Sequence, residues 1–139
     1  MKRHNVDSAL RDMLASVTTK NIGMSQVPAA LTVGEPYAIL YQSPSPGVGE
    51  YDGSWADPED CRRFDFLVKS VGRSHRQAAW MSTAVNEAIM VRSHNGWVNA
   101  LSPSGLNVID RSTVSMGAIV RTGEDLFEVN DIYRLKVTK

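Results

Sequence analysis

FDFLVKSVGRSHRQAAWMSTAVNEAIM, residues 64–90, carries most of the structural information in this chain, because it predicts a strand, a turn and a helix in direct succession. Phe64, Phe66 and Val68 occupy alternate positions, which is the period of a strand that buries one face. Aromatic and β-branched side chains suit such a pleated surface. Gly72 follows as the residue that ends the strand.

The second half of this stretch begins with the start signal of a helix. Ser74 is a candidate N-cap, because its hydroxyl can accept a hydrogen bond from a free amide of the first turn. Gln77, three residues later, completes the S-x-x-Q pattern of a capping box. Apolar residues then recur at helical spacing, at Ala78, Met81, Val85, Ala88 and Ile89. A helix of about 16 residues is roughly 24 Å long, which is enough to cover a small sheet.

Length and composition predict a single globular domain over residues 1–139. A chain of 139 residues can bury a substantial core, and 42% of its residues are apolar. We expect no membrane helix, since no segment reaches about 18 apolar residues, and no signal peptide, since the N-terminus lacks an apolar run. A net charge of +0 implies no general attraction to nucleic acid. The single Cys61 excludes an internal disulfide and favours synthesis in a reducing cytoplasm.

The flanking segments supply the remaining elements. Asp7 or Ser8 can cap a first helix that runs to about Val17. Residues 18–36 are rich in turn formers and are expected to be irregular, with at most a short helix near Pro28. The apolar run YAILYQ, Tyr37–Gln42, predicts a strand covered on both faces. Further strands are predicted at 97–101, 106–109, 115–121 and 127–137. The expected fold class is α+β, a mixed, mostly antiparallel sheet with the two helices packed on one face.

A long loop of about residues 43–60 lies between the strand at Tyr37–Gln42 and the strand that contains Phe64. It holds three prolines and three glycines, and its acids are not balanced by any Lys or Arg. The acids are Glu50, Asp52, Asp57, Glu59 and Asp60. Three interpretations are open: a solvated acidic loop, a Ca²⁺ or Mg²⁺ site, or a surface that repels DNA in a passage. The spacing does not match an EF-hand, and we expect no metal or other cofactor.

The residues that most often carry chemistry do not form a recognisable constellation. Cys61 lacks a Cys-His-Asn signature, and the three histidines, His4, His75 and His94, lack metal-binding spacing. Residues 72–76 form a basic turn at a helix N-terminus, which can bind phosphate, but the glycines of a P-loop are absent. We therefore expect a protein without enzymatic activity.

Three residues near this turn are candidates for a subunit interface. Arg73 and Arg76 suit ion pairs, either within the subunit or across an interface. Trp80 lies off the apolar stripe of the helix, so it either widens the buried face or anchors a partner.

The order of short motifs along the chain resembles that of the tail terminator proteins of long-tailed actinobacterial siphophages. Residues 36–41, PYAILY, match a P-Y-A-V-L-Y strand, and a Pro/Gly/acidic loop follows in both. Residues 71–80, VGRSHRQAAW, match the V-G-R-[ST]-x-x-Q-A-x-W turn and helix start. Residues 131–138, DIYRLKVT, match a D-x-Y-R-L-x-V-T strand, whereas Asp110-Arg111 has the family's R-D pair in reverse order. The similarity covers residues 8–139.

The resemblance implies a structural protein of the virion. Family members form a ring, typically a hexamer, that caps the head-proximal end of the tail tube and stops its polymerisation. The implied partners are other copies of the chain, the major tail tube protein, the head-tail connector or stopper protein, and genomic DNA that passes through the channel; no membrane is involved. Glu50, Asp52 and Asp57 would then line the channel. The alternatives are a head-tail connector or stopper protein, and a small nucleic-acid-binding module or enzyme.

Overall fold

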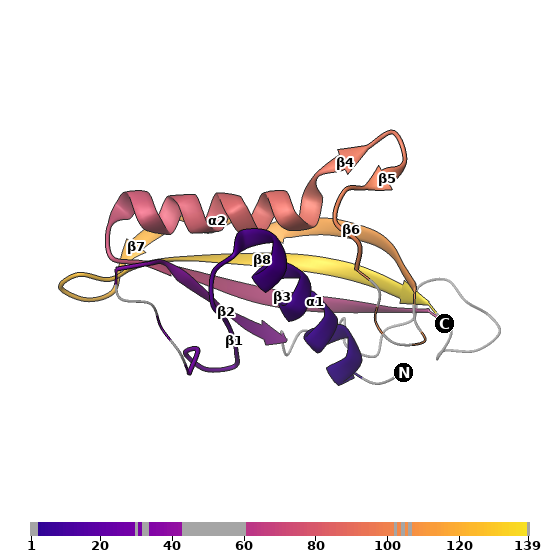
Figure 1. The fold of residues 1–139 in the computed structure, drawn as a ribbon, viewed down its shortest axis with the longest axis horizontal. Helices are drawn as coiled ribbons and strands as arrows, with labels where there is room; N and C mark the ends of the chain where they lie inside the picture. The colour runs from indigo at the N-terminus through magenta and orange to yellow at the C-terminus, as the bar shows by residue number, and fades with distance from the viewer. Residues whose placement is uncertain are drawn as a thin grey trace.

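The computed structural model describes residues 3–29, 31, 34–42, 61–101, 103, 105 and 107–138. This part of the chain contains two helices, a six-stranded sheet and a small two-stranded hairpin (Figure 1). The helices are α1 (Arg3–Thr18) and α2 (His75–Met90). The sheet strands are β1 (Ile22–Met24), β2 (Tyr37–Gln42), β3 (Cys61–Gly72), β6 (Asn107–Ser115), β7 (Ile119–Arg121) and β8 (Phe127–Thr138). The hairpin strands are β4 (Arg92–Ser93) and β5 (Gly96–Trp97). The predicted α+β class is confirmed.

Two long strands form the centre of the sheet, whose order is β1-β2-β3-β8-β6, with β7 also paired to β8. β3 and β8 have 12 residues each and pair antiparallel along their whole length, from Cys61 opposite Thr138 to Gly72 opposite Phe127. Only β1 and β2 run parallel, so the sheet is mixed and mostly antiparallel, as predicted.

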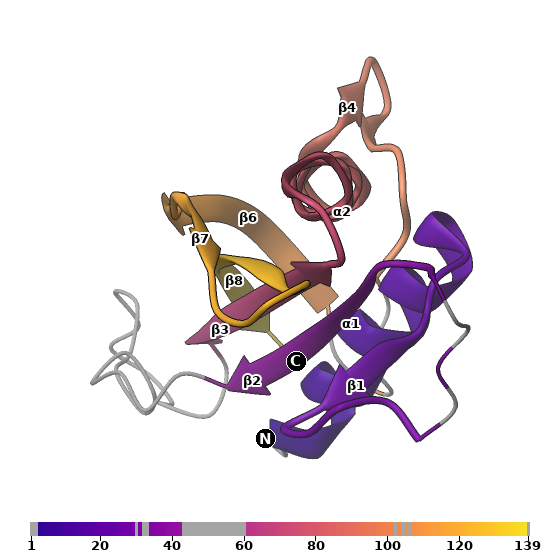
Figure 2. The same ribbon diagram turned by 90° about the vertical axis from the view of Figure 1, so that its left-hand side faces the viewer.

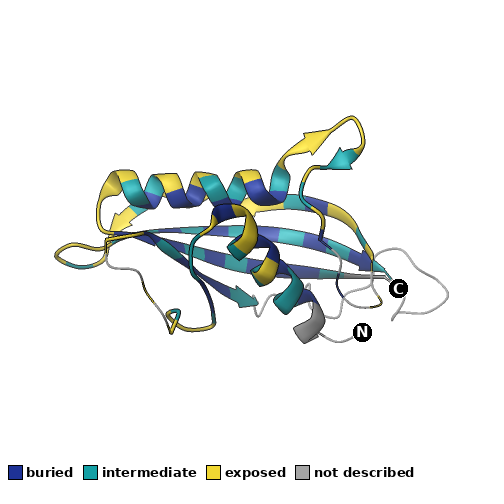
Figure 3. Ribbon diagram, in the orientation of Figure 1, coloured by how far each residue is buried: buried dark blue, intermediate teal, exposed yellow. Residues whose placement is uncertain are grey.

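The core lies between one face of the sheet and both helices. Phe64, Phe66 and Val68 are buried on this face, as the alternation predicts, and they lie opposite Leu135, Tyr133 and Asp131 of β8. Figure 2, which looks along the long axis, shows α2 over the centre of the sheet and α1 beside it over β1 and β2. The buried residues of α2 lie on its side toward the sheet (Figure 3). The prediction that both helices cover one face is confirmed.

The start of α2 has the predicted cap and one additional hydrogen bond, from the Gln77 side chain to the segment before β2. Ser74 has an extended backbone (φ −140°, ψ 162°), and its Oγ accepts a hydrogen bond from the Gln77 amide at 3.2 Å. The Gln77 side chain accepts from the Arg73 amide at 2.9 Å and donates to the Gly34 carbonyl at 2.7 Å. Gln77 therefore fixes both the turn before α2 and the segment that leads into β2.

The first helix begins earlier than predicted, whereas its end at Thr18 agrees with the predicted end at about Val17. It begins at Arg3, so the predicted start at Asp7 or Ser8 is wrong. Val6 is fully buried and extends the apolar stripe by one turn toward the N-terminus, and this burial outweighs the local capping signal. Val17 is 42% exposed, so it does not belong to the buried stripe.

The segment expected to be irregular contains a short strand. In β1, Ile22, Gly23 and Met24 pair in parallel with Ala38, Ile39 and Leu40 of β2. No short helix forms at Pro28. The prediction missed β1 because three residues show no periodicity, and their pairing depends on a strand more than ten residues away.

The C-terminal strands are placed differently from the prediction, except for the last. The strand expected at 97–101 is wrong, because only Gly96 and Trp97 pair, within the hairpin. The one expected at 106–109 continues as β6 to Ser115. The one expected at 115–121 is interrupted at residues 116–118, where the Gly117 amide turns toward the Asp131 carboxylate. The strand predicted at 127–137 is confirmed as β8.

Candidate assembly surfaces

Trp80 lies on the flank of α2 that faces α1, and 50% of its surface is exposed. It therefore does not widen the buried face, which was one of its two predicted roles. Thr19, with φ 58°, turns the chain after α1 and directs Lys20 toward the indole. Lys20 Nζ lies 5.7 Å from the ring centroid and 3.3 Å from the Glu35 carboxylate. These contacts hold the tryptophan at the surface.

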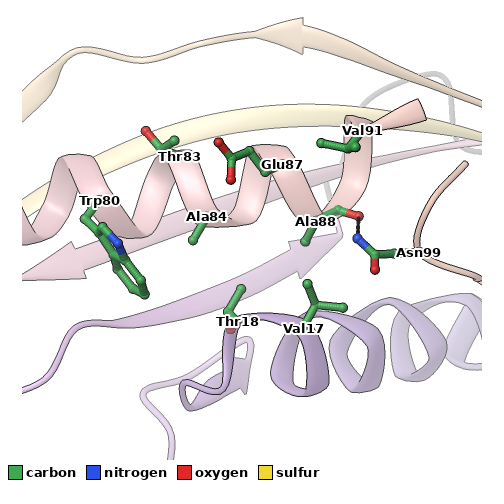
Figure 4. Close-up of a pocket in the computed structure, with 9 residues that line it drawn as sticks. All are labelled: Val17, Thr18, Trp80, Thr83, Ala84, Glu87, Ala88, Val91 and Asn99. Atoms are coloured by element: carbon green, nitrogen blue, oxygen red, sulfur yellow. Dashed lines mark hydrogen bonds between the residues drawn. The ribbon is translucent and has the colours of Figure 1, made fainter. Parts of the chain in front are cut away.

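A groove runs from Trp80 along the seam between α1 and α2 (Figure 4). Its volume is about 550 Å³, and much of its wall is apolar, including Val17, Ala84 and Val91. Glu87 is the one charged residue among the described residues of the lining, and its carboxylate forms no ion pair with another described residue. Two further hollows, of about 480 and 270 Å³, share lining residues with this groove and extend it at both ends.

The predicted interface arginines lie at the N-terminal end of α2. Arg73, in the turn, and Arg76, in the first turn of the helix, are both exposed. Neither forms an ion pair with another residue in the part of the chain that the structure describes. Arg76 and Trp80 are four residues apart, so they share one flank of α2, while Arg73 lies before the helix.

A buried arginine binds carbonyl groups at the C-terminal end of α2, and the sequence did not predict that it would be buried. Arg111 of β6 donates to the carbonyls of Ile89 (3.1 Å) and Asn99 (2.7 Å), and Asn99 in turn donates to the Ala88 carbonyl at 3.0 Å. A cation is favourable at a helix C-terminus, where carbonyls lack partners. Burial lowers the pKa of Arg111 from its ordinary value. Its guanidinium also lies 5.1 Å from the Trp97 ring.

The DIYR segment of β8 is tied to three other elements. The Asp131 carboxylate is fully buried and accepts from Ser82 Oγ of α2 at 2.6 Å and from the Gly117 amide at 2.9 Å. Arg134, on the other face of the sheet, makes a bidentate pair with Asp65 of β3 at 2.7 and 3.0 Å. The buried carboxylate of Asp131 thus fixes the connection between β6 and β7, and that of Asp65 joins β3 to β8 at the centre of the sheet.

Tyr133 of the same segment completes the polar contacts beneath α2. Its hydroxyl accepts from Asn86 Nδ2 at 3.3 Å, and the Asn86 amide also approaches the Met116 sulfur at 3.9 Å. Burial raises the pKa of Tyr133 to about 12, and the nearby Asp131 adds to this rise. Ser82 and Asn86 therefore connect α2 to β8 and to the segment after β6.

The outer edge of β6 presents apolar side chains to solvent. The register of β6 on β8 shifts twice, once between Val108 and Asp110 and once between Thr113 and Ser115. The extra residues at these bulges are Ile109 and Val114, which are 54% and 45% exposed. The nearby Met116 and Val120 are exposed as well.

The remaining sequence expectations concern the channel residues, metal binding and a membrane helix. The proposed channel residues Glu50, Asp52 and Asp57 lie outside the described residues. Within the described part of the chain, no group of three or more His, Cys, Asp or Glu side chains could hold a metal ion. No described helix is long and apolar enough to cross a membrane.

Comparison with known proteins identifies the fold. No protein-family model and no curated protein matches the sequence. Among solved structures, a chain from the virion of a native gene transfer agent particle has a TM-score of 0.57 at 18% identity, over 96% of this chain and 92% of that chain. A second solved chain has a TM-score of 0.58 at 17% identity, over 99% and 95%. These similarities show a shared fold over nearly the whole chain.

Proposed function

We propose that this chain is a structural protein of a phage-like virion that caps the head-proximal end of the tail tube as a ring of identical subunits. The observation that carries the proposal is the fold similarity to a chain of a gene transfer agent virion, at a TM-score of 0.57 over 96% of this chain. The motif order of residues 36–41, 71–80 and 131–138 supports the narrower role of a tail terminator.

The surfaces of the subunit suit this role. A closed ring uses head-to-tail contacts, so each subunit needs two different patches that complement each other. The groove between α1 and α2 and the outer edge of β6 are our candidates for these patches, since both expose apolar side chains. The polar groups of the DIYR segment serve folding contacts, and we propose no catalytic role for them.

The proposed ring has three further partners. One side of it would meet the major tail tube protein and stop its polymerisation, while the other side would meet the head-tail connector or stopper protein. Genomic DNA would pass through the centre without sequence-specific binding. Glu50, Asp52 and Asp57 are proposed to line this opening, where like charges repel DNA and prevent sticking. The protein would be made in the host cytoplasm and end in the virion.

Electron microscopy of the purified protein mixed with tail tubes tests the role. We expect rings, typically of six subunits, at one end of each tube, and shorter tubes when the protein is present during polymerisation. Binding to a head-tail connector without binding to tubes would instead favour the stopper alternative. Protein that never contacts tubes or connectors would refute the proposal.

The acidic residues have their own test in the same particles. Replacing Glu50, Asp52 and Asp57 with lysine should leave rings intact but slow DNA passage, and the effect should weaken as salt screens the charges. A ring structure that places these residues on the outer rim would contradict the channel assignment and leave the capping role untouched.

A further inference from the structure

The groove between α1 and α2 and the outer edge of β6 lie on opposite flanks of α2. Trp80, Ala84 and Glu87 line the groove, and Figure 4 shows Trp80 and Ala84 pointing toward α1. Ser82 and Asn86 instead bond toward β8 and the segment after β6. Figure 2 shows the same arrangement, with α1 on one side of α2 and β6 and β7 on the other. A single subunit can therefore use both surfaces at once, each with a different neighbour.

The edge of β6 suits contact with another molecule through side chains more than through backbone hydrogen bonds. In the described chain no strand pairs with its outer edge, since β6 is the last strand of the sheet order. A regular free edge would invite strand addition by another chain. The bulges at Ile109 and Val114 break the regular row of amides and carbonyls, and they expose apolar side chains there. A concave apolar surface fits this edge better than a second strand does.

Each of the two surfaces carries one charge that can pair with the other. Glu87 lines the middle of the groove and has no ion pair with a described residue, whereas Lys20, at the Trp80 end, is paired with Glu35. On the other flank, the exposed Arg121 of β7 donates only to the carbonyls of Gly123 and Glu124, so its charge lacks an ion pair with a described residue. An arginine of one copy can thus meet the carboxylate of the next.

We infer that the β6–β7 edge of one subunit docks into the α1/α2 groove of the next copy of this chain. Ile109 and Val114 pack against the wall that includes Trp80 and Ala84, and Arg121 pairs with Glu87. The contact is head-to-tail, so it leaves one groove and one edge free at the ends of any open chain, and it is satisfied only in a closed ring. This inference rests on the proposed homo-oligomeric ring and names its interface.

Two variants that each disable one surface test the head-to-tail geometry. Ala84→Arg fills the groove and leaves the edge intact, whereas Ile109→Asp combined with Val114→Asp disables the edge and leaves the groove intact. Size-exclusion chromatography with light scattering should show monomers for each variant alone. Mixed together they should form a dimer of one copy each and nothing larger, because the remaining groove and edge are both disabled. Val27→Asp, at a position 47% exposed and away from both surfaces, is the control and should assemble like wild type.

A charge exchange tests the predicted pair independently. Glu87→Arg and Arg121→Glu should each weaken self-association by about fivefold, while the double variant should recover most of it. Trp80→Ala should weaken it by about tenfold or more. Circular dichroism must show that each variant is folded, which we expect since Ala84 is half-buried in the open groove and the other positions are exposed.

Four results would overturn the inference. In the first, a variant with a disabled groove or a disabled edge still forms wild-type oligomers. In the second, one of these variants dimerises with itself, and in the third, such a variant loses tube binding while its self-association is unchanged. In the fourth, the wild-type protein stays monomeric at every concentration and on tubes. The first three leave the proposed capping function standing. A ring that assembles through these surfaces but never binds tubes would instead refute the capping function and keep the interface.

Discussion

Replacing Arg111 with methionine should destabilise the protein by removing the hydrogen bonds that close the C-terminal end of α2. The substitution keeps a long side chain but removes two donors, which leaves the Ile89 and Asn99 carbonyls without partners in a buried place. Hydrogen bonds from a charged donor contribute about 1.5–3 kcal/mol each. Part of this gain is offset by the desolvation that also lowers the pKa of Arg111, so we expect a net loss of about 2–4 kcal/mol.

Urea unfolding followed by far-UV circular dichroism measures this loss, and a thermal scan should show a Tm lower by about 6–14 °C. The matched control is Arg92→Met, since the Arg92 guanidinium also lies near the Trp97 ring, 4.7 Å from its centroid, but Arg92 is exposed. It should cost no more than about 1 kcal/mol. If Arg111→Met costs less than the control, the assignment of Arg111 as the closure of α2 is wrong.

Three other predictions concern the polar contacts and turns of the core. The pKa of Tyr133 is about 12 in the folded protein, against an ordinary 10.0. The neutral hydroxyl therefore makes its full contribution to the free energy of unfolding below pH 10, and this contribution is lost as the pH rises through 12. Tyr133→Phe should therefore reduce alkaline destabilisation by about 2 kcal/mol in unfolding measured from pH 9 to 12, and an unchanged profile would contradict this. Gly117→Ala should cost about 2 kcal/mol or more in urea unfolding, since its Cβ would lie 2.3 Å from the Asn130 carbonyl oxygen; a neutral effect would show that the segment relaxes. Ser74→Ala should cost about 1 kcal/mol by loss of the α2 cap, and Ser74→Asp should retain most of the stability; equal losses in both would argue against the cap.

The parts of the fold that could be predicted are those in which a local pattern and the tertiary structure agree. The alternation of Phe64, Phe66 and Val68 and the S-x-x-Q signal at Ser74 describe interactions within a few residues of each other. Strand β1 and the ends of β6 depend on partners that are distant in sequence, so no local pattern reveals them. The start of α1 was misplaced because a local capping signal competed with the burial of Val6.

The candidate surfaces likewise depend partly on local patterns and partly on contacts between residues that are distant in sequence. Trp80 could be singled out because an aromatic residue stands off the apolar stripe of its helix, but its groove exists only because α1 ends beside α2. Ile109 lay at the end of one predicted strand and Val114 lay just before the next, and the bulges that expose them follow from the register of β6 on β8. Asp131 and Arg111 were named in the sequence only as parts of motifs, and their burial and hydrogen bonds could not be predicted from it.

The sequence by itself determined the central unit of this protein, a strand, a capped turn and a helix over residues 64–90, because each of its signals acts over one or two turns of chain. It also indicated a likeness to phage tail terminators through the order of its motifs. Only the tertiary structure decided which surfaces remain open. The groove and the edge lie on opposite flanks of α2 because Ser82, Asn86 and Arg111 fasten that helix to β8 and β6, while α1 packs against its other side. Such contacts join residues 22 to 49 positions apart, and no local pattern specifies distances of that length.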